Sequence, residues 1–200
     1  MRLSASRLSV ERGGRIVFAD LSFAIESGES LVVTGRNGAG KSTLLRALAG
    51  LLPLAAGEIS CAPAGEETVP EMAHYLGHAD ALKGALTVTE NLDFFAAILG
   101  SGRGGLPAQE ALAAFGLAHV AALPAAYLSA GQKRRAALAK LLVASRPVWL
   151  LDEPSTALDA DSQIVMAKIM AAHLAGGGMI VAATHIRLDL AGRELRLGRA

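Results

Sequence analysis

The sequence has little cysteine, little net charge and few long apolar runs, and each shortage excludes a class of protein. Cys61 is the single cysteine among 200 residues, so no disulfide can form within the chain, and a reducing compartment suits it. We interpret Cys61 as a small apolar filler. The formal net charge is only +1, so the chain lacks the electrostatic footprint of a nucleic-acid-binding protein.

Charged residues such as Arg7 and Glu11 interrupt the apolar runs near the N-terminus, so we expect no signal peptide. Residues 111–132 contain no Lys, Arg, Asp or Glu, but they are rich in alanine and are broken by Gly116 and Pro124. This stretch is typical of a buried helix and a loop rather than of a membrane span. We expect a soluble protein with one α/β domain, whose core the 52 % hydrophobic content can supply.

A glycine-rich stretch carries the strongest functional signal in the chain. Residues 35–43 read Gly-Arg-Asn-Gly-Ala-Gly-Lys-Ser-Thr and fit the phosphate-binding loop, which is Gly, four residues, then Gly-Lys-Ser/Thr. Leu31–Val33 is predicted to be a buried strand before the loop, and Thr43–Ala49 a helix that ends at Gly50. The residues expected to bind a nucleotide are Gly35, Arg36, Asn37, Gly38, Ala39, Gly40, Lys41, Ser42 and Thr43.

This loop has the chemistry that a triphosphate requires. The glycines let backbone N–H groups point at an anion, and the N-terminus of the following helix adds its dipole. Lys41 is expected to reach the terminal phosphates, and the hydroxyl of Ser42 to bind magnesium. The alternative interpretation is a glycine-rich loop that matches the pattern by chance. Such a loop need not lie between a strand and a helix, as this one is predicted to do.

A second apolar strand ends in two carboxylates. Val148–Leu151 is followed by Asp152, Glu153 and Pro154, and an acid at the carboxyl end of a strand can hold magnesium beside a phosphate loop. We predict that Asp152 is a magnesium ligand together with Ser42. Glu153 is predicted to accept a proton from the water that attacks the γ-phosphate, or to orient that water, and general-base help is typically worth ~10²–10⁴-fold in rate. A charged strand end with a turn is the alternative.

The order of the expected elements indicates an α/β core interrupted by helices. We expect strands at 3–10, 16–18, 21–25, 31–33, 58–61, 74–78, 148–151, 179–183 and 193–197. We expect helices at 43–49, 89–99, 108–115, 132–145 and 160–174. The hairpin-like strands before the loop predict an antiparallel edge in a mixed sheet. The approximate parts are a nucleotide-binding core at 1–78 and 146–200 and an inserted helical lobe at 79–145.

Further motifs resemble those of ABC-type ATPases. Leu128–Gln132 reads Leu-Ser-Ala-Gly-Gln and resembles the family's signature motif, usually Leu-Ser-Gly-Gly-Gln, with Ala130 in place of the first glycine. Ser155–Asp159 resembles the loop after the acidic strand, and Thr184–His185 resembles the switch histidine that closes an apolar strand. These motifs and the phosphate loop span most of the chain in the family's order. The resemblance implies a P-loop ABC-type ATPase core with an inserted helical lobe.

The resemblance also implies how the site works. Two ABC-type ATPase units pair head-to-tail on ATP binding, and the signature of each covers the γ-phosphate held by the other. Ser129, Gly131 and Gln132 would act in this way across a homodimer, from a helix end suited to an anion. His185 would stabilise charge in the transition state, although a lone histidine can also be structural. The catalytic residues implied are Glu153, His185 and Lys41.

Two positions depart from the family's pattern. His78 stands where the family usually has a glutamine that senses magnesium, and an imidazole can bind a metal-bound water but changes charge with pH. Arg12 stands where the family stacks an aromatic ring on adenine, and a guanidinium plane stacks less strongly. We therefore expect weak base selectivity. Phe18 lies nearby and is not assigned this role.

Tyr75–His78, the short chain and residues 128–135 resemble the ATP-binding subunits of the haem-exporter-type ABC complex in bacterial cytochrome c maturation. This resemblance implies hydrolysis of ATP with Mg²⁺ at the cytoplasmic face of the inner membrane. It also implies that CcmB-like and CcmC-like integral membrane subunits are partners, and that segment 78–90 contacts them. Alternatively, this segment is an ordinary part of the hydrophobic core of the helical lobe. We expect neither nucleic acid nor directly bound haem, because no histidine or cysteine makes a credible haem site.

Three rival functions fit fewer of these residues. The nearest is the ATPase subunit of another small ABC transporter with a different cargo. A soluble ABC-type ATPase that acts on DNA or ribosomes usually carries tandem cassettes, coiled-coil insertions or basic arms, which this sequence lacks. A non-hydrolysing nucleotide sensor is the third, and it does not explain Glu153 and His185.

Overall fold

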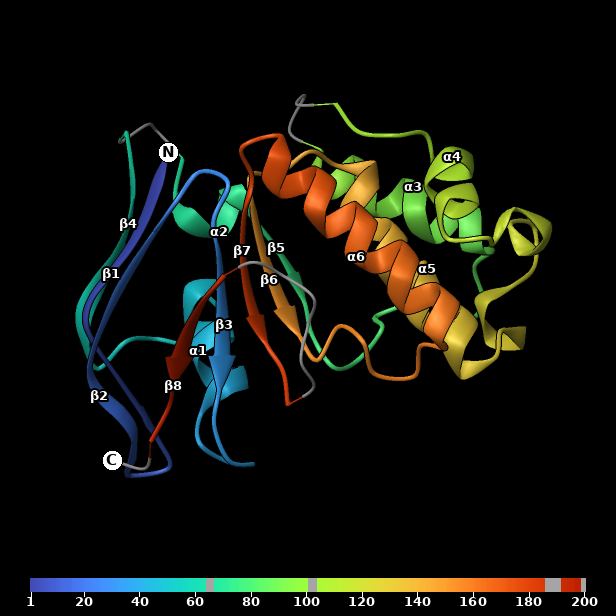
Figure 1. Cartoon of the computed structure of the whole chain (residues 1–200). Coiled ribbons are helices and arrows are strands. Elements are labelled where there is room, and N and C mark those ends of the chain that lie inside the picture. Colours follow the sequence, from blue (N-terminus) through green and yellow to red (C-terminus); the bar gives the residue numbers. More distant parts are fainter. Residues whose placement is uncertain (64–66, 101–103, 186–191, 199–200) are drawn as a thin grey trace. The chain divides into compact units, whose positions relative to one another are not determined.

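The computed structural model describes residues 1–63, 67–100, 104–185 and 192–198 (Figure 1). The chain divides into two compact units. The first comprises residues 1–77, 147–153 and 170–200, and the second comprises 78–146 and 154–169. The first contains the strands and the phosphate loop, and the second consists of helices and connecting turns.

A parallel sheet forms the centre of the first unit. Its strands run in the order β5-β6-β7-β3-β8. Their bounds are Ser30–Thr34 for β3, Ala73–Leu76 for β5, Val148–Asp152 for β6, Met179–Ala183 for β7 and Arg193–Arg196 for β8. Every residue of β6 and β7 is buried, as expected for apolar runs inside a parallel sheet. The carboxyl ends of β3, β6 and β7 meet at one edge, which brings three of the predicted motifs together (Figure 1).

The antiparallel strands form a sheet of their own. β1 (Arg2–Arg12) lies between β2 (Arg15–Glu26) and β4 (Ala56–Ala62). The sequence predicted these strands as the edge of a mixed sheet. Both edges of β1 are already paired, and in the described part of the chain no ladder joins this sheet to the parallel one. The α/β class is as expected, with two sheets in place of one.

The strands predicted at 16–18 and 21–25 are one continuous strand, β2, with a bulge in its middle. Leu8 pairs with Leu21 and Val10 with Phe18, so β2 has one residue more than β1 over this interval. Asp20 absorbs the extra residue in a left-handed conformation, φ 52°, and its N–H donates to the hydroxyl of Ser9. The irregularity breaks the alternation of side chains, which is why the sequence suggested two strands.

Helix α1 (Lys41–Leu48) joins the two sheets into one core. Leu44, Leu45 and Leu48 are completely buried and belong to the same apolar cluster as residues of β1, β6 and β7. Gly50 follows the helix with a φ of 69°, and the N–H of Leu51 donates to the carbonyl of Arg46 at 2.8 Å. This pattern is that of a glycine-terminated helix, so the predicted stop is confirmed.

A short helix, α2 (Val69–Met72), lies between the strands predicted at 58–61 and 74–78, where the sequence predicted no helix. Thr68 and Glu71 form a capping box, in which the N–H of Thr68 donates to the carboxylate of Glu71 at 2.7 Å. Pro70 stands in the first turn, where its missing N–H has no helical partner to lose. The Thr-x-x-Glu spacing is the signal that could have identified this helix.

Helices make up the second unit. They are α3 (Val88–Leu99), α4 (Ala108–Ala114), α5 (Ala130–Val143) and the first part of α6 (Ala160–Ala175), with single 3₁₀ turns at Ala118–Val120 and Ala125–Tyr127. Thr87 and Ser129 cap α3 and α5 through capping boxes with Glu90 and Gln132. α5 begins two residues before its predicted start because Ser129 is its cap. Among the described residues, no helix combines the length and the apolar character needed to cross a bilayer.

Candidate nucleotide-binding site

The backbone of the phosphate loop requires glycine at particular positions. Gly35 has a φ of 142°, and a Cβ atom there would lie 2.6 Å from the carbonyl oxygen of Leu197. Gly40 has a φ of 99°, and a Cβ atom there would lie 2.7 Å from a methyl group of Val17. Both conformations are rare for residues with side chains, and both positions lack space for one. The loop is therefore built around its glycines, as its sequence pattern predicted.

The side chains of Lys41 and Ser42 are fixed at the N-terminus of α1. The Nζ atom of Lys41 donates to the carbonyl of Gly35 at 2.9 Å and to that of Arg36 at 3.4 Å, and the residue is buried. The hydroxyl of Ser42 donates to Oδ1 of Asp152 at 3.0 Å. The acid at the end of β6 therefore points at the phosphate loop, which is the placement that its predicted role requires.

Glu153 and His185 meet beyond the ends of β6 and β7. Nδ1 of His185 lies 2.9 Å from Oε2 of Glu153, whose side chain is 18 % exposed. Glu153 has a left-handed φ of 49°, and its N–H donates to the carbonyl of Ala183 at 2.8 Å. A left-handed residue other than glycine costs about 1–3 kcal/mol and persists where its surroundings impose it. The structure thus brings the two residues together and holds the carboxylate in one direction.

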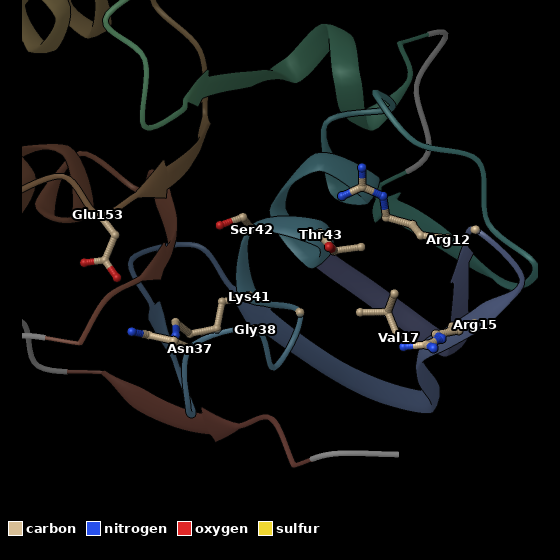
Figure 2. Close-up of a pocket in the computed structure, with 11 residues that line it drawn as sticks. Arg12, Arg15, Val17, Asn37, Gly38, Lys41, Ser42, Thr43 and Glu153 are labelled. Carbon is tan, nitrogen blue, oxygen red and sulfur yellow. The ribbon is translucent and has the colours of Figure 1, made fainter.

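A cavity of about 750 Å³ opens beside the loop (Figure 2). Figure 2 shows Arg12 and Arg15 on one side of it and Glu153 on the other, with Lys41 between them. Its lining residues are Arg12, Gly13, Arg15, Val17, Asn37, Gly38, Gly40, Lys41, Ser42, Thr43 and Glu153. The arginines place positive charge where a nucleotide would extend from the loop. Among the predicted loop residues, Gly35, Arg36 and Ala39 do not line this cavity, and Ala39 is buried in the core.

The sequence did not identify Arg15 and Val17 as lining residues. Arg12 and Arg15 are direct partners across the turn between β1 and β2, so their side chains leave the same end of the hairpin. The two glycines between them, Gly13 and Gly14, are the sequence signal of a tight hairpin turn that could have indicated this pairing. Phe18 is 4 % exposed and belongs to the core cluster, so it is not available to a nucleotide base. No aromatic residue occurs among the cavity's lining residues in the described part of the chain.

The signature residues lie in the second unit, at the N-terminus of α5. The hydroxyl of Ser129 accepts the N–H of Gln132 at 3.2 Å, and the N–H of Ser129 donates to Oε1 of Gln132 at 2.9 Å. Gly131 lies in the first turn, where a Cβ atom would lie 3.2 Å from the carbonyl of Ala157. Both polar side chains of the motif are thus used to cap their own helix.

His78 is the first residue of the second unit and is exposed. It does not line the cavity beside the phosphate loop. The sequence-based expectation that it replaces a metal-sensing glutamine therefore stays a prediction.

Taken together, the parallel sheet, the glycine loop and the acid at the end of β6 define a P-loop nucleotide-binding protein with an added helical unit. The sequence model of the ABC transporter family matches residues 18–156, and the chain belongs to this family. It is therefore a nucleotide-binding ATPase of the ABC class, as the sequence predicted.

Relatives extend this similarity over the whole length. The chain is 60 % identical over 201 residues to the cytochrome c biogenesis ATP-binding export protein CcmA of Nitrobacter winogradskyi, with 100 % of both chains covered. It is 55 % identical to the protein of the same name from Bradyrhizobium diazoefficiens, with 99 % of this chain and 98 % of the relative covered.

Solved structures agree on the fold. A putative ABC transporter ATP-binding protein from Pyrococcus furiosus superposes with a TM-score of 0.83 at 24 % identity, covering 98 % of each chain. The ATP-binding subunit of another ABC transporter superposes with a TM-score of 0.82 at 27 % identity, covering 93 % of this chain and 80 % of the other. The expected fold class is confirmed.

Proposed function

We propose that this ATPase is the ATP-hydrolysing subunit of a membrane ABC complex for cytochrome c biogenesis, in which it drives haem export or haem-chaperone release. Full-length relatives at 55–60 % identity bear the name of a cytochrome c biogenesis export protein, which supports this cargo class. The alternative is a small ABC transporter with another cargo. The proposed location is the cytoplasmic face of the bacterial inner membrane, where the chain is peripheral.

The hydrolytic step follows from the contact between Glu153 and His185, which is the observation that carries the proposal. Glu153 accepts a proton from the water that attacks the γ-phosphate, and His185, 2.9 Å away, fixes the direction of its carboxylate. Lys41 lies at the loop's centre, where its ammonium group neutralises charge on the terminal phosphates. The backbone N–H groups of the loop hold the remaining phosphate oxygens.

The residues at the loop fit a nucleotide-bound Mg²⁺. Magnesium in phosphoryl-transfer sites takes one or two protein oxygens and completes its shell with phosphates and water. The hydroxyl of Ser42 and the carboxylate of Asp152, which are 3.0 Å apart, are such oxygens and would hold the ion. When bound, the ion supplies charge neutralisation of the β- and γ-phosphates.

A second copy would complete the site. Ser129, Gly131 and Gln132 lie at the N-terminus of a 14-residue helix, whose dipole favours an anion. We propose that they cover the γ-phosphate of the partner copy in a head-to-tail homodimer formed on ATP binding. His78 would replace the metal-sensing glutamine, and segment 78–90, with Ala81 and Ala85 exposed, would contact CcmB-like and CcmC-like membrane subunits. Neither nucleic acid nor directly bound haem belongs to this proposal.

A complementation experiment tests the proposed cargo. The chain is expressed in a bacterium that lacks its own cytochrome c maturation ATPase, and covalently bound haem is measured on c-type cytochromes. Wild type should restore the cytochromes and co-purify with integral membrane subunits, whereas Lys41→Ala should restore none. Active ATP hydrolysis without any cytochrome recovery would assign the chain to a transporter with a different cargo.

A further inference from the structure

Arg134 is a charged residue in the interior of the helical unit. It lies on α5, five residues beyond Ser129, and is only 3 % exposed. Arginine is almost never buried unless its donors are paired, because removing a charge from water is costly. The partners of this guanidinium group therefore indicate what it is there to hold.

The guanidinium group of Arg134 contacts two segments that are distant from each other in the sequence. Its Nη1 atom lies 3.3 Å from Oδ1 of Asp80, and its Nε atom donates to the carbonyl of Pro154 at 3.4 Å. Both segments are places where the chain enters the helical unit, which His78 and Pro154 begin. Arg134 therefore binds at both entry points, from the helix that carries the signature motif.

The contact to Pro154 matters because of the residue before it. Glu153 has a left-handed backbone, so the direction of its carboxylate depends on the turn that follows. Proline has no N–H group, so its carbonyl is the only backbone group through which a hydrogen bond can hold Pro154. A planar fork of donors can bind this carbonyl and a carboxylate together, which a lysine ammonium does less well.

A second buried cation holds the same acid. Lys140, also on α5, is 7 % exposed and donates to the backbone carbonyl of Asp80, and its Nζ atom lies 4.3 Å from the ring centroid of Phe95. Burial, together with the charge of Arg134, lowers the pKa of Lys140 to about 8, although the nearby carboxylate opposes this shift. Arg134 thus contacts the carboxylate of Asp80 and Lys140 its backbone carbonyl, and two buried cations beside one aspartate form a costly arrangement, since apolar side chains would fill the same space without buried charge.

We propose that Arg134 is a positioning residue, which ties the signature end of α5 to the backbone after Glu153 and to the segment after His78. This inference deepens the proposed function and rests on it. Arg134 does not touch the nucleotide; it fixes the turn that aims Glu153 and couples that turn to the helix engaged by the second copy. Asp80 binds both buried cations, Arg134 through its carboxylate and Lys140 through its backbone carbonyl.

Arg134→Gln and Arg134→Lys test this role, with Arg135→Gln as the matched control. Arg135 is the next residue on α5, and its Nη1 atom donates to the carbonyl of Phe115 at 3.2 Å. Loss of Arg134 should lower kcat for ATP about 10- to 100-fold, because small misplacements of a reacting group cost that much. The affinity for ATP, set by the phosphate loop, should change less than about 3-fold, which is below the effect of one good hydrogen bond. Arg135→Gln should leave kcat near wild type.

A double-mutant cycle separates positioning from a general loss of structure. Asp80→Asn should lower kcat in the same way, and Asp80→Asn with Arg134→Gln should cost little more than either change alone, because the pair acts as one unit. If Arg134→Gln fails to fold, Arg134→Lys and Asp80→Asn decide the question by the same split between kcat and KM. Unchanged kcat in these folded variants, or parallel losses in Arg134→Gln and Arg135→Gln, would overturn the inference.

Amide hydrogen exchange provides a readout that does not depend on hydrolysis. Arg134→Gln should speed exchange at residues 79–83 and 155–158, whereas Arg135→Gln should affect the end of α4. Failure of the wild-type chain to hydrolyse ATP would remove the proposed function, and the exchange pattern would still decide whether Arg134 holds both entry points. Unchanged exchange at both segments contradicts the inference even if ATP hydrolysis is intact.

Discussion

Individual side chains at this site are fixed by contacts that reach across the sheet. Ser42 on α1 bonds Asp152 on β6, and His185 after β7 lies against Glu153. The sequence predicted these roles because each motif follows a recognisable strand or loop, and the carboxyl ends of parallel strands meet at one edge. Arg15 could not be predicted in this way, because its place depends on the register of a hairpin rather than on a motif.

Replacement of Glu153 by glutamine should separate ATP binding from hydrolysis. Glu153→Gln keeps the shape of the side chain and its contact with His185 but cannot accept a proton, so turnover should fall by ~10²–10⁴-fold. Binding of a fluorescent ATP analogue should persist, and size-exclusion chromatography with ATP should show a trapped dimer. Glu110→Gln, at an exposed position on α4, should hydrolyse ATP at the wild-type rate. Wild-type turnover in Glu153→Gln would mean that another group takes the proton.

Replacement of Arg12 by an aromatic residue should tighten the binding of a purine nucleotide. In the described part of the chain the cavity is lined by two arginines and no aromatic ring, so the base has weak stacking partners. Stacking of a base on an aromatic ring is worth about 1–3 kcal/mol, so Arg12→Tyr should raise the affinity for ATP by about 5-fold or more, and that for GTP alike, because every base has a π-face. Arg2→Tyr, on the same strand and paired with Glu26, is the control. Unchanged affinities in titrations of both nucleotides would show that the base does not approach Arg12.

At the level of helices and strands, the sequence did not predict features that depend on how strands pair with one another. Most predicted helices and strands exist, with boundaries shifted by caps such as Ser129. The separate antiparallel sheet could not be predicted, because a sequence shows that a strand alternates but not which edge it joins. The bulge at Asp20 concealed the continuity of β2 for the same reason. Short helices such as α2 carry too few residues for periodicity to reveal them.

The junction between the phosphate loop and α1 should tolerate no side chain at Gly40. Gly40→Ala forces a left-handed φ on a residue with a Cβ atom and brings that atom 2.7 Å from Val17. Gly38→Ala is the matched control, because Gly38 also has a positive φ, 80°, but has open space around it. Conformational strain alone costs about 1–3 kcal/mol, so both variants should melt below wild type, and Gly40→Ala lowest. Equal melting temperatures for the two variants in calorimetry would mean that contact with Val17 costs nothing.

At the scale of the whole molecule, unit boundaries depend on contacts that no local pattern contains. The sequence placed the helical lobe at 79–145, whereas the compact helical unit of the structure also includes residues 154–169. That segment follows the acidic strand directly, so composition and order could not separate it from the core. Its assignment depends on tertiary contacts such as the bond from Arg134 to Pro154.

The first unit contains a half-buried histidine that should make its stability depend on pH. His173 near the end of α6 stacks on Trp149 of β6, with ring centroids 3.8 Å apart and planes at 9°. A Cβ atom at Gly178 would lie 2.2 Å from Nε2 of His173, so the ring fits only against a glycine. No hydrogen-bond partner for Nε2 occurs among the described residues. Burial lowers the pKa of His173 below its ordinary 6.5, because the charged form is poorly solvated there.

The sign of the effect follows from proton binding. Since the pKa is lower in the folded chain, the unfolded chain binds more protons once the pH falls below 6.5, and the free energy of unfolding then decreases. The stabilising contribution is complete above pH 6.5 and is lost as the pH falls toward the folded-state pKa. The melting temperature should therefore fall more steeply from pH 8 to pH 5 for wild type than for His173→Phe, which keeps the stack on Trp149 without a titrating group. His119→Gln, at an exposed position, should follow wild type. Parallel curves for wild type and His173→Phe would show that His173 titrates alike in the folded and unfolded chains.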